Sequence, residues 1–377
     1  MIGSLDISGT ERHLATIAPR LKERGWQPVI YCLAARGAQA QDAEKAGVTV
    51  IAPTWEIKAS QTSFGKFVRT LLSAAKLFTI LVRRRPQIVH FFLPAAYLIG
   101  APLAIASRRP FRIMSRRSLN LYQQKYRNLR FFEHQLHRKM HALVGNSEAV
   151  TKELRHEAGN APVALIYNGV DISKYTPLPS RERKPDTLRL IIVANLIPYK
   201  GHADLFRALS LISHSLPSSW ELLCVGRDDG IGAALAEEAK RLQIDGHIRI
   251  LGSRTDIPEL LASADIGILC SHQEGFSNAV LEGMAAGLPM VVTDVGGNAE
   301  AVLDRTTGFV VPAHDPNSLG KAILSLAFDP QMRAQMSKAG RLRAEKHFSL
   351  DRCIDDYDAL YRRLATSLKL HAVARDY

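Results

Sequence analysis

Short apolar runs of strand length alternate with segments of helical periodicity along almost the whole chain. In the first half the strand-like runs are 29–33, 48–51, 88–92, 111–115, 142–146 and 163–167. A second series runs from Leu188–Ala194 to Gly308–Pro312, again with a helix-like segment after most strands. Repeated β–α units form a parallel sheet covered by helices. The sequence therefore predicts an α/β protein, and its 377 residues suit two doubly wound domains.

A polar, proline-rich segment separates the two series and predicts the domain boundary. Tyr175–Asp186 contains three prolines and several charged residues, which is typical of a linker. The last strongly amphipathic helix is predicted from Leu350 to Ser367. We therefore expect an N-terminal domain over 1–175, a second domain over 176–349, and a C-terminal helical segment over 350–377.

The start of the chain is unusual for a doubly wound fold. Gly3–Thr10 has the composition of a loop after a first strand, yet only Met1 and Ile2 precede it. Such a sheet normally places its first strand centrally. We infer that most of this strand is missing, or that Ile2–Leu5 forms a shortened strand. An in-frame apolar run upstream of the start codon would support the first interpretation.

The net charge of +13 is unevenly distributed. Residues 1–175 contain 26 Lys/Arg and 11 Asp/Glu, a balance of +15, whereas the remainder contains 23 and 25, a balance of −2. Between Arg108 and Lys139 there are ten basic residues and one acid, Glu133, interleaved with five aromatic residues. This pattern favours an anionic membrane surface or an anionic acceptor. A solvated basic face is the alternative, and nucleic acid is the least favoured partner.

The cysteines and the longest apolar stretch indicate the cellular compartment of the protein. Cys32, Cys224, Cys270 and Cys353 lack metal-type spacing and are interpreted as reduced residues, three of them in apolar core-like segments. No signal peptide is recognisable, and the apolar stretch 93–107 contains two prolines and is too short to span a bilayer. We therefore expect a cytoplasmic protein, with peripheral attachment to the inner face of the cell membrane.

The stretch Ser271–Glu300 carries the strongest functional signal. It is predicted to form a strand end, a polar loop, a short helix that Ser277 or Asn278 can cap, a second strand and a glycine loop. A helix start presents free N–H groups and suits a phosphate. Glu274 lies before the helix and Glu282 inside it, and carboxylates suit sugar hydroxyls.

Loops that follow other strands of the second half add cationic and polar residues. Open α/β sheets bind ligands at the carboxyl ends of their strands. The residues at these positions are Asn195 and Lys200, Gly226 and Arg227, and Ser253 and Arg254. Together with the turn 274–278, they predict an anion-binding site in the second domain.

These motifs resemble those of a large family, the retaining GT-B glycosyltransferases that use nucleotide sugars. The resemblance is carried by Glu274-x7-Glu282 with Gly275-Phe276, by Gly296-Gly297-Asn298-Ala299-Glu300, by Lys200-Gly201, by Asn168-Gly169-Val170-Asp171, and by Ser8-Gly9-Thr10 with the residues through Leu14. It covers nearly the whole chain, and the motifs occur in the family order. It implies a GT-B fold of two Rossmann-like domains, with the C-terminal helix crossing back to the first domain.

The resemblance also implies roles for individual residues. Glu274 would contact the hydroxyls of the donor sugar, and Glu282 would hold the ribose or, alternatively, serve as a structural helix carboxylate. Lys200 would neutralise the departing diphosphate. The backbone N–H groups of Gly275, Phe276, Ser277 and Asn278 would bind the sugar and the diphosphate. Gly9 would let the backbone approach the phosphate or the acceptor closely, and Arg227 and Arg254 would contact phosphate and base. His90 would lie either near the reaction centre or in the packed core.

Two positions depart from the family pattern. Asn195 stands where the family usually has an arginine that pairs with the lysine, and an amide cannot supply that charge. Either Arg227 or Arg254 substitutes, or diphosphate binding is weaker. Ser8 also replaces the first glycine of the usual pair, which changes how donor or acceptor approaches.

No cofactor or metal ion is expected. The only Asp-x-Asp, Asp356-Tyr357-Asp358, falls within the predicted last helix, and no His/Cys cluster has zinc spacing. Asp228-Asp229 has the context of a turn. No carboxylate nucleophile is identifiable, so we adopt the front-face attack usually described for the family as the hypothesis for retention.

The sequence thus predicts a metal-independent glycosyltransferase of the hexosyltransferase class. Its basic first domain would bind a lipid-linked or cell-surface glycan acceptor, and its second domain would bind a UDP- or GDP-sugar donor. A sugar-nucleotide epimerase or a phosphorylase on the same fold is an alternative, because fold alone does not fix function. A basic protein that binds membrane or nucleic acid through a decayed site is another.

Overall fold

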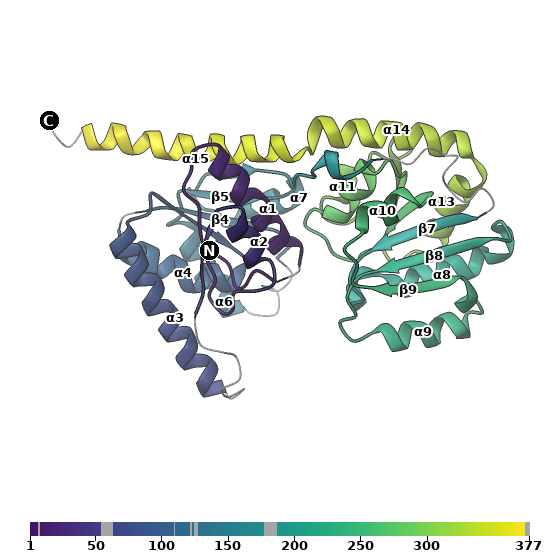
Figure 1. The fold of residues 1–377 in the computed structure, drawn as a ribbon, viewed down its shortest axis with the longest axis horizontal. Helices are drawn as coiled ribbons and strands as arrows, with labels where there is room; N and C mark the ends of the chain where they lie inside the picture. The colour runs from purple at the N-terminus through teal and green to yellow at the C-terminus, as the bar shows by residue number, and fades with distance from the viewer. Residues whose placement is uncertain are drawn as a thin grey trace. The chain divides into compact units, whose positions relative to one another are not determined.

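The computed structural model divides the chain into two compact units. It describes residues 1–6, 8–53, 63–108, 110–120, 123, 127–176 and 187–373. Unit 1 comprises Met1–Tyr167 with Cys353–Tyr377, and unit 2 comprises Asn168–Arg352 (Figure 1). Most of the predicted linker, and two aromatic residues of the basic stretch, Tyr122 and Tyr126, lie outside the described residues.

Unit 1 is built from parallel strands and covering helices, as predicted. Strands β3–β6 form one parallel sheet in sequence order, and β1 and β2 form a parallel pair. The elements are α1 Gly9–Glu23, β1 Val29–Tyr31, α2 Ala40–Lys45, β2 Thr49–Ile51, α3 Ser63–Arg84, β3 Ile88–Phe92, α4 Pro94–Ala106, β4 Phe111–Arg116, α6 Arg127–His137, β5 Ala142–Gly145, α7 Glu148–Glu157 and β6 Val163–Leu165.

The first two residues occupy the central position between these two sheets. The amide of Ile2 donates to the carbonyl of Tyr31 at 3.0 Å on one side. On the other side the amide of Phe92 donates to the carbonyl of Met1 at 2.9 Å. Ile2 forms one parallel bridge, to Cys32, and no strand is assigned between residues 2 and 5. Met1 and Ile2 therefore stand where a doubly wound sheet has its first strand.

The last helix, α15 Leu350–Val373, packs on unit 1 from Cys353 onward. Its Tyr357 and Tyr361 are buried, and the indole of Trp26 donates to the Asp358 carboxylate at 2.7 Å. The predicted crossing-back helix is thus confirmed. Asp356-Tyr357-Asp358 is a turn of this helix, as expected.

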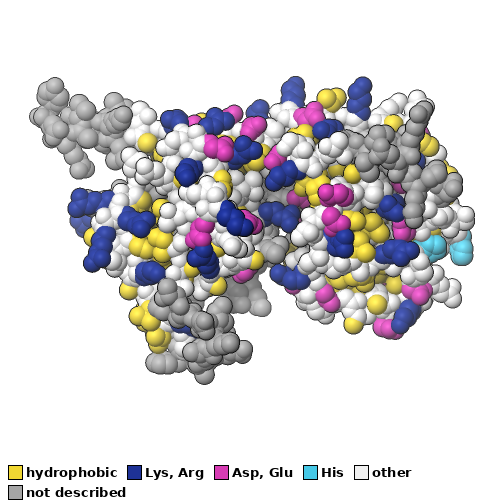
Figure 2. Space-filling view, in the orientation of Figure 1, with side chains coloured by type: hydrophobic (Ala, Val, Ile, Leu, Met, Phe, Trp, Pro, Cys, Tyr) yellow, Lys and Arg dark blue, Asp and Glu magenta, His cyan; other side chains and the backbone are white. Residues whose placement is uncertain are grey.

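Helix α3 presents an apolar outer face and carries basic but no acidic residues. Leu77 and Leu81 are buried, whereas Phe67, Leu71 and Val82 are 61%, 53% and 44% exposed. Residues three, four or seven apart share one side of a helix, so the exposed residues form a stripe. The helix contains five Lys/Arg and no Asp or Glu. Figure 2 shows yellow and dark-blue side chains side by side over this part of the molecule.

Unit 2 contains one six-stranded parallel sheet in the order β12-β11-β10-β7-β8-β9. Its elements are β7 Leu188–Val193, α8 His202–Ile212, β8 Trp220–Val225, α9 Gly232–Arg241, β9 Ile248–Gly252, α10 Ile257–Ala262, β10 Ile266–Leu269, α11 Asn278–Ala285, β11 Met290–Thr293, α12 Asn298–Ala301, β12 Gly308–Val311, α13 Pro316–Phe328 and α14 Pro330–His347. This is the doubly wound order, with the reversal between β7 and β10. The predicted fold class, two Rossmann-like units with parallel sheets, is confirmed.

The segment from Asn168 to Tyr175 belongs to unit 2 by its contacts. The amide of Val170 donates to the carbonyl of Phe348, and the amide of Leu350 donates to the carbonyl of Val170, both at 2.9 Å. The Arg341 guanidinium donates to the carbonyl of Tyr175 at 2.6 Å. The unit boundary therefore falls at 167/168 rather than at the linker, because these bonds hold the segment to α14 and its C-terminal end.

Two further expectations concern the cysteines and the helices. All four cysteines are free and buried, as predicted for core residues. Among the described helices, none combines the length and the hydrophobicity needed to cross a bilayer.

Candidate functional site

The carboxyl ends of β7 and β10 meet at the point where the strand order of unit 2 reverses. These two strands pair in parallel, with Ile192 opposite Ile268. The loop after β7 carries Asn195 and Lys200, and the loop after β10 carries Glu274. In open α/β sheets a ligand binds in the crevice at such a reversal, so the fold brings two predicted loops to one candidate site.

Lys200 and Glu274, two of the three predicted catalytic residues, are in direct contact. The Lys200 ammonium lies 2.5 Å from Oε1 of Glu274, and the side chains are 18% and 11% exposed. The Ser271 hydroxyl donates to the same carboxylate oxygen at 2.8 Å. Two donors thus fix the Glu274 carboxylate while leaving its other oxygen outside these two bonds. Lys200 also lies over the Tyr199 ring, 5.5 Å from the centroid.

Two glycines allow this close approach of loop and strand. Gly201 has a φ of +76°, and a Cβ there would collide with the carbonyl oxygen of Cys270 at the end of β10. Gly296 has a φ of +53°, and a Cβ there would collide with the carbonyl oxygen of Glu274. Only glycine adopts such backbone without strain while filling no space. The Lys-Gly and Gly-Gly motifs therefore position Lys200 and Glu274 against each other.

The start of α11 is held by a residue from a distant motif. The Asn168 side-chain amide donates to the carbonyl of Phe276 at 2.8 Å and to Oδ1 of Asn278 at 2.7 Å. Ser277 occupies the predicted N-cap position, but among the described residues its hydroxyl makes no capping hydrogen bond. A helix start without a side-chain cap is suited to an anion. Glu282 is buried within α11, one turn further on.

Asn195 and Arg227 share a carboxylate partner, Asp229. The Asn195 amide donates to Asp229 at 3.2 Å, and its Oδ1 accepts from the backbone amide of Arg227 at 3.2 Å. The Arg227 guanidinium binds Asp229 through Nε at 2.6 Å and Nη2 at 3.2 Å. The Arg227 hydrogen bond holds the pKa of Asp229 below its ordinary value. The Arg227 guanidinium therefore lies next to Asn195, the position at which the family pattern has an arginine.

The other predicted cation is arranged differently. Arg254 lies in the loop after β9 and pairs with Asp256 through Nε at 2.8 Å and Nη2 at 2.5 Å, both groups exposed. The Asp228 carboxylate accepts from the amides of Gly230, Ile231 and Gly232. It therefore closes a turn, as the sequence indicated.

His90 and Gly9 belong to unit 1, whereas the other predicted site residues belong to unit 2. His90 is buried, with Nδ1 2.7 Å from the Tyr361 hydroxyl and Nε2 2.7 Å from the Ser115 hydroxyl. Burial holds its pKa well below the usual range, so the imidazole stays neutral. Since both ring nitrogens have protein partners, the geometry favours the packed-core interpretation. Gly9 is the first residue of α1, after Ser8, whose hydroxyl bonds Glu11.

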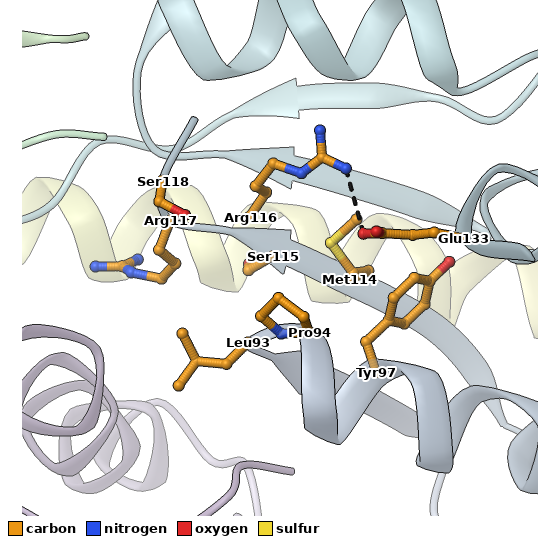
Figure 3. A pocket seen from close by; sticks show the side chains of 9 residues that line it. All are labelled: Leu93, Pro94, Tyr97, Met114, Ser115, Arg116, Arg117, Ser118 and Glu133. Carbon is orange, nitrogen blue, oxygen red and sulfur yellow. Dashed lines mark hydrogen bonds and ion pairs between the residues drawn. The ribbon is translucent and has the colours of Figure 1, made fainter. Parts of the chain in front are cut away.

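Unit 1 has a small pocket at the carboxyl ends of β3 and β4 (Figure 3). Its lining includes Leu93, Tyr97, Arg116, Arg117 and Glu133. The buried Arg116 guanidinium bonds the Glu133 carboxylate at 3.3 Å and also reaches a carboxylate of α7 at 2.6 Å. Burial lowers the pKa of Arg117. Arg116 of the basic 108–139 stretch is thus buried inside the unit and Arg117 is partly buried, whereas the charge pattern of the sequence favoured an anionic membrane surface or acceptor as the partner of the whole stretch.

Sequence reasoning missed two partners at the unit 2 site. Asn168 was recognised only as part of an Asn-Gly-Val-Asp motif, and its contact with Asn278 of α11 spans 110 residues. Asp229 was recognised only as a turn residue. The motif itself was the available signal for Asn168, whereas no sequence pattern indicates that Asp229 binds Arg227.

Models of known protein families match both halves of the chain. Residues 7–174 match a family model described as Glycosyltransferase Family 4, and residues 187–329 match one described as Glycosyl transferases group 1. The D-inositol 3-phosphate glycosyltransferase of Streptomyces avermitilis is 29% identical over 220 residues, which cover 54% of this chain and 47% of that protein. The matched segment therefore spans about half the length of this curated relative.

Two solved structures show the same fold. HepE from Anabaena, crystallised in complex with UDP, has a TM-score of 0.81 at 22% identity and 98% coverage of both chains. Sucrose-phosphate synthase from Thermosynechococcus elongatus has a TM-score of 0.81 at 18% identity, covering 97% of this chain and 96% of that one. These likenesses establish the architecture of both units.

Proposed function

The chain belongs to the group 1 glycosyltransferases, and on this basis we propose that it transfers a hexose, with retention of configuration, from a nucleotide-diphosphate sugar to a glycan acceptor. The observation that carries the proposal is the Lys200–Glu274 contact beside the start of α11. It combines a cation, a carboxylate and a helix N-terminus, which suit a diphosphate joined to a sugar.

The donor is proposed to lie across the ends of β7 and β10. Glu274 accepts hydrogen bonds from sugar hydroxyls, and the amides from Gly275 to Asn278 bind sugar and diphosphate. Glu282, inside α11, holds the ribose hydroxyls. UDP is the favoured nucleotide, with GDP as the alternative, because HepE was crystallised with UDP and with UDP-glucose.

Catalysis in this proposal is electrostatic. Negative charge develops on the departing diphosphate, and Lys200 together with the positive end of α11 stabilises it in the transition state. Arg227 supplies the charge that Asn195 lacks once its guanidinium turns from Asp229 to phosphate. We propose that no metal ion takes part, and that the leaving phosphate helps to deprotonate the acceptor on the same face of the sugar.

The acceptor is proposed to be a lipid-linked or cell-surface glycan bound by unit 1. The apolar stripe of α3, with five cations and no acid, suits the surface of an anionic bilayer. This stripe supports peripheral attachment to the inner membrane face better than the 108–139 stretch, because Arg116 of that stretch is buried inside unit 1 and paired with Glu133.

The decisive test replaces Glu274 with alanine. We expect Glu274→Ala to abolish sugar transfer while UDP still binds within a few-fold, because the carboxylate is assigned to the sugar and not to the nucleotide. Glu259→Gln, on the exposed start of α10, is the matched control and should leave turnover unchanged. Turnover retained in Glu274→Ala would count heavily against the assignment.

The same preparation separates the alternatives. Calorimetry with UDP and GDP tests the decayed-site interpretation, which the Asn195 departure favours and which predicts binding to neither nucleotide. A screen of nucleotide-sugar hydrolysis identifies the donor, and product analysis with and without acceptor separates transfer from epimerisation.

A further inference from the structure

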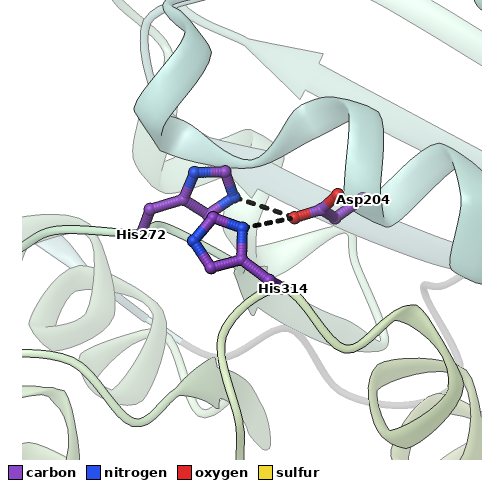
Figure 4. A group of neighbouring side chains, drawn as sticks. All are labelled: Asp204, His272 and His314. Carbon is purple, nitrogen blue, oxygen red and sulfur yellow. Dashed lines mark hydrogen bonds and ion pairs between the residues drawn. The ribbon is translucent and has the colours of Figure 1, made fainter.

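Three residues of unit 2 that the proposed reaction does not use converge on one carboxylate oxygen (Figure 4). Asp204 lies in the first turn of α8, His272 in the loop after β10, and His314 in the loop between β12 and α13. Nε2 of His272 is 2.8 Å from Oδ2 of Asp204, and Nδ1 of His314 is 3.7 Å from the same oxygen. All three ligand atoms lie within 4.8 Å of one another.

We propose that Asp204, His272 and His314 form a binding site for a divalent transition-metal ion of the zinc class. Zinc accepts imidazole nitrogen and carboxylate oxygen at about 2.0–2.2 Å in a tetrahedral arrangement, which separates ligand atoms by about 3.3–3.4 Å. The observed separations of 2.8 and 3.7 Å bracket this value. Small side-chain rotations therefore complete the geometry, and the two nitrogen ligands favour zinc over magnesium or calcium.

The surroundings of the cluster fit three protein ligands with an open fourth position. The other oxygen of Asp204 accepts from Arg207 at 3.3 Å, which orients the carboxylate so that Oδ2 faces the imidazoles. The His314 side chain is 66% exposed, which gives an ion access from solvent. The three residues lie 68 and 42 positions apart in sequence, so no local spacing pattern could indicate the site.

A hydrogen bond between Asp204 and His272 alone would not require the third residue. The His314 ring nevertheless lies with its centroid 3.8 Å from that of His272, at an angle of 37°. Two imidazoles this close, each with a nitrogen near Oδ2 of Asp204, can bind one cation through those nitrogens. The arrangement is thus better matched to a bound ion than to an isolated Asp–His pair.

The ion would join the first turn of α8 to two loops next to the donor site. The backbone amide of His272 donates to the carbonyl of Tyr199 at 2.7 Å, and Tyr199 precedes Lys200. Ser271, before His272, bonds Glu274. A metal at this cluster would therefore restrain the segments that carry Lys200 and Glu274 without touching the reacting atoms, which is a regulatory or stabilising role.

The test is a titration of the full chain, stripped with a chelator, using zinc alone. We expect calorimetry to show one ion bound per chain and cobalt to give the intense visible absorption of tetrahedral coordination. His314→Ala should weaken zinc binding by about tenfold or more, and Asp204→Asn should do the same. His214→Ala, an exposed histidine of the same unit, is the matched control and should bind as the unaltered chain does.

Equal zinc affinity in His314→Ala and the unaltered chain would overturn the proposal, as would a cobalt spectrum without tetrahedral bands. His314 lies on an exposed loop, so its replacement keeps the test valid if Asp204→Asn fails to fold. The titration needs no nucleotide and no turnover. Failure of zinc binding is therefore distinguishable from failure of the glycosyltransferase proposal, which UDP calorimetry reads separately.

Discussion

Replacing Gly201 with alanine tests whether the Lys-Gly turn positions Lys200 against the end of β10. The residue has a φ of +76°, which costs an L-residue about 1–2 kcal/mol. The added Cβ also meets the Cys270 carbonyl, a backbone atom that cannot rotate away. Overpacking of this kind costs about 1–3 kcal/mol. The two effects together predict a loss of about 2–5 kcal/mol from the free energy of unfolding of unit 2.

Gly252→Ala is the matched control for the backbone effect. Gly252 ends β9 with a φ of +67°, and a Cβ there meets no atom within 4 Å. This variant should therefore lose only the cost of the positive φ, about 1–2 kcal/mol of the free energy of unfolding. The difference between the two variants isolates the collision with Cys270.

Hydrogen exchange followed by mass spectrometry reads the free energy of opening for β7 and β10 separately from unit 1. UDP calorimetry on the same samples should show affinity reduced about tenfold or more in Gly201→Ala, because a shift of about 1.4 kcal/mol in binding corresponds to a factor of ten. Equal exchange rates and equal UDP affinity in the two variants would refute the positioning argument.

Three further outcomes follow from other contacts. Asp229→Asn releases Arg227 and should raise UDP affinity a few-fold by calorimetry, and a weaker affinity would exclude Arg227 as the substitute cation. Burial lowers the pKa of His202 from 6.5 to about 4. As the pH falls, His202 is therefore protonated in the unfolded chain before it is protonated in the folded chain. Unit 2 should therefore lose up to about 3 kcal/mol of stability as pH falls from 6.5 to 4, and His202→Gln should flatten this dependence in hydrogen exchange. Phe67→Asp with Leu71→Asp should abolish sedimentation with vesicles containing anionic lipid, and unchanged sedimentation would argue against α3 as the membrane surface.

The local elements could be predicted because periodicity is a local property. The expected strand 88–92 is found unchanged, and the expected strand 111–115 is found as Phe111–Arg116. The glycine loop after β11 was predicted without a helix, but Asn298–Ala301 forms one short turn of helix. Four residues carry too little periodicity to be recognised.

Contacts between residues that are distant in the sequence were harder to predict. Lys200 and Glu274 could be assigned to one site because both follow parallel strands, but their direct pairing depends on the order β10-β7 in the sheet. The Arg116 side chain points into unit 1 because it pairs with Glu157, 41 residues later in the sequence. A charge count over 108–139 does not include Glu157. Charge composition therefore described the segment without indicating which cations reach solvent.

The packing of α15 on unit 1 has a consequence for biosynthesis. Tyr361 bonds His90, and Asp358 bonds Trp26, so residues near the end of the chain complete a core that begins at its start. Every strand of unit 2 has left the ribosome before Asp358 and Tyr361 are added to the chain. We therefore expect the second unit to finish folding first during translation, while the first waits, incomplete, for its closing helix.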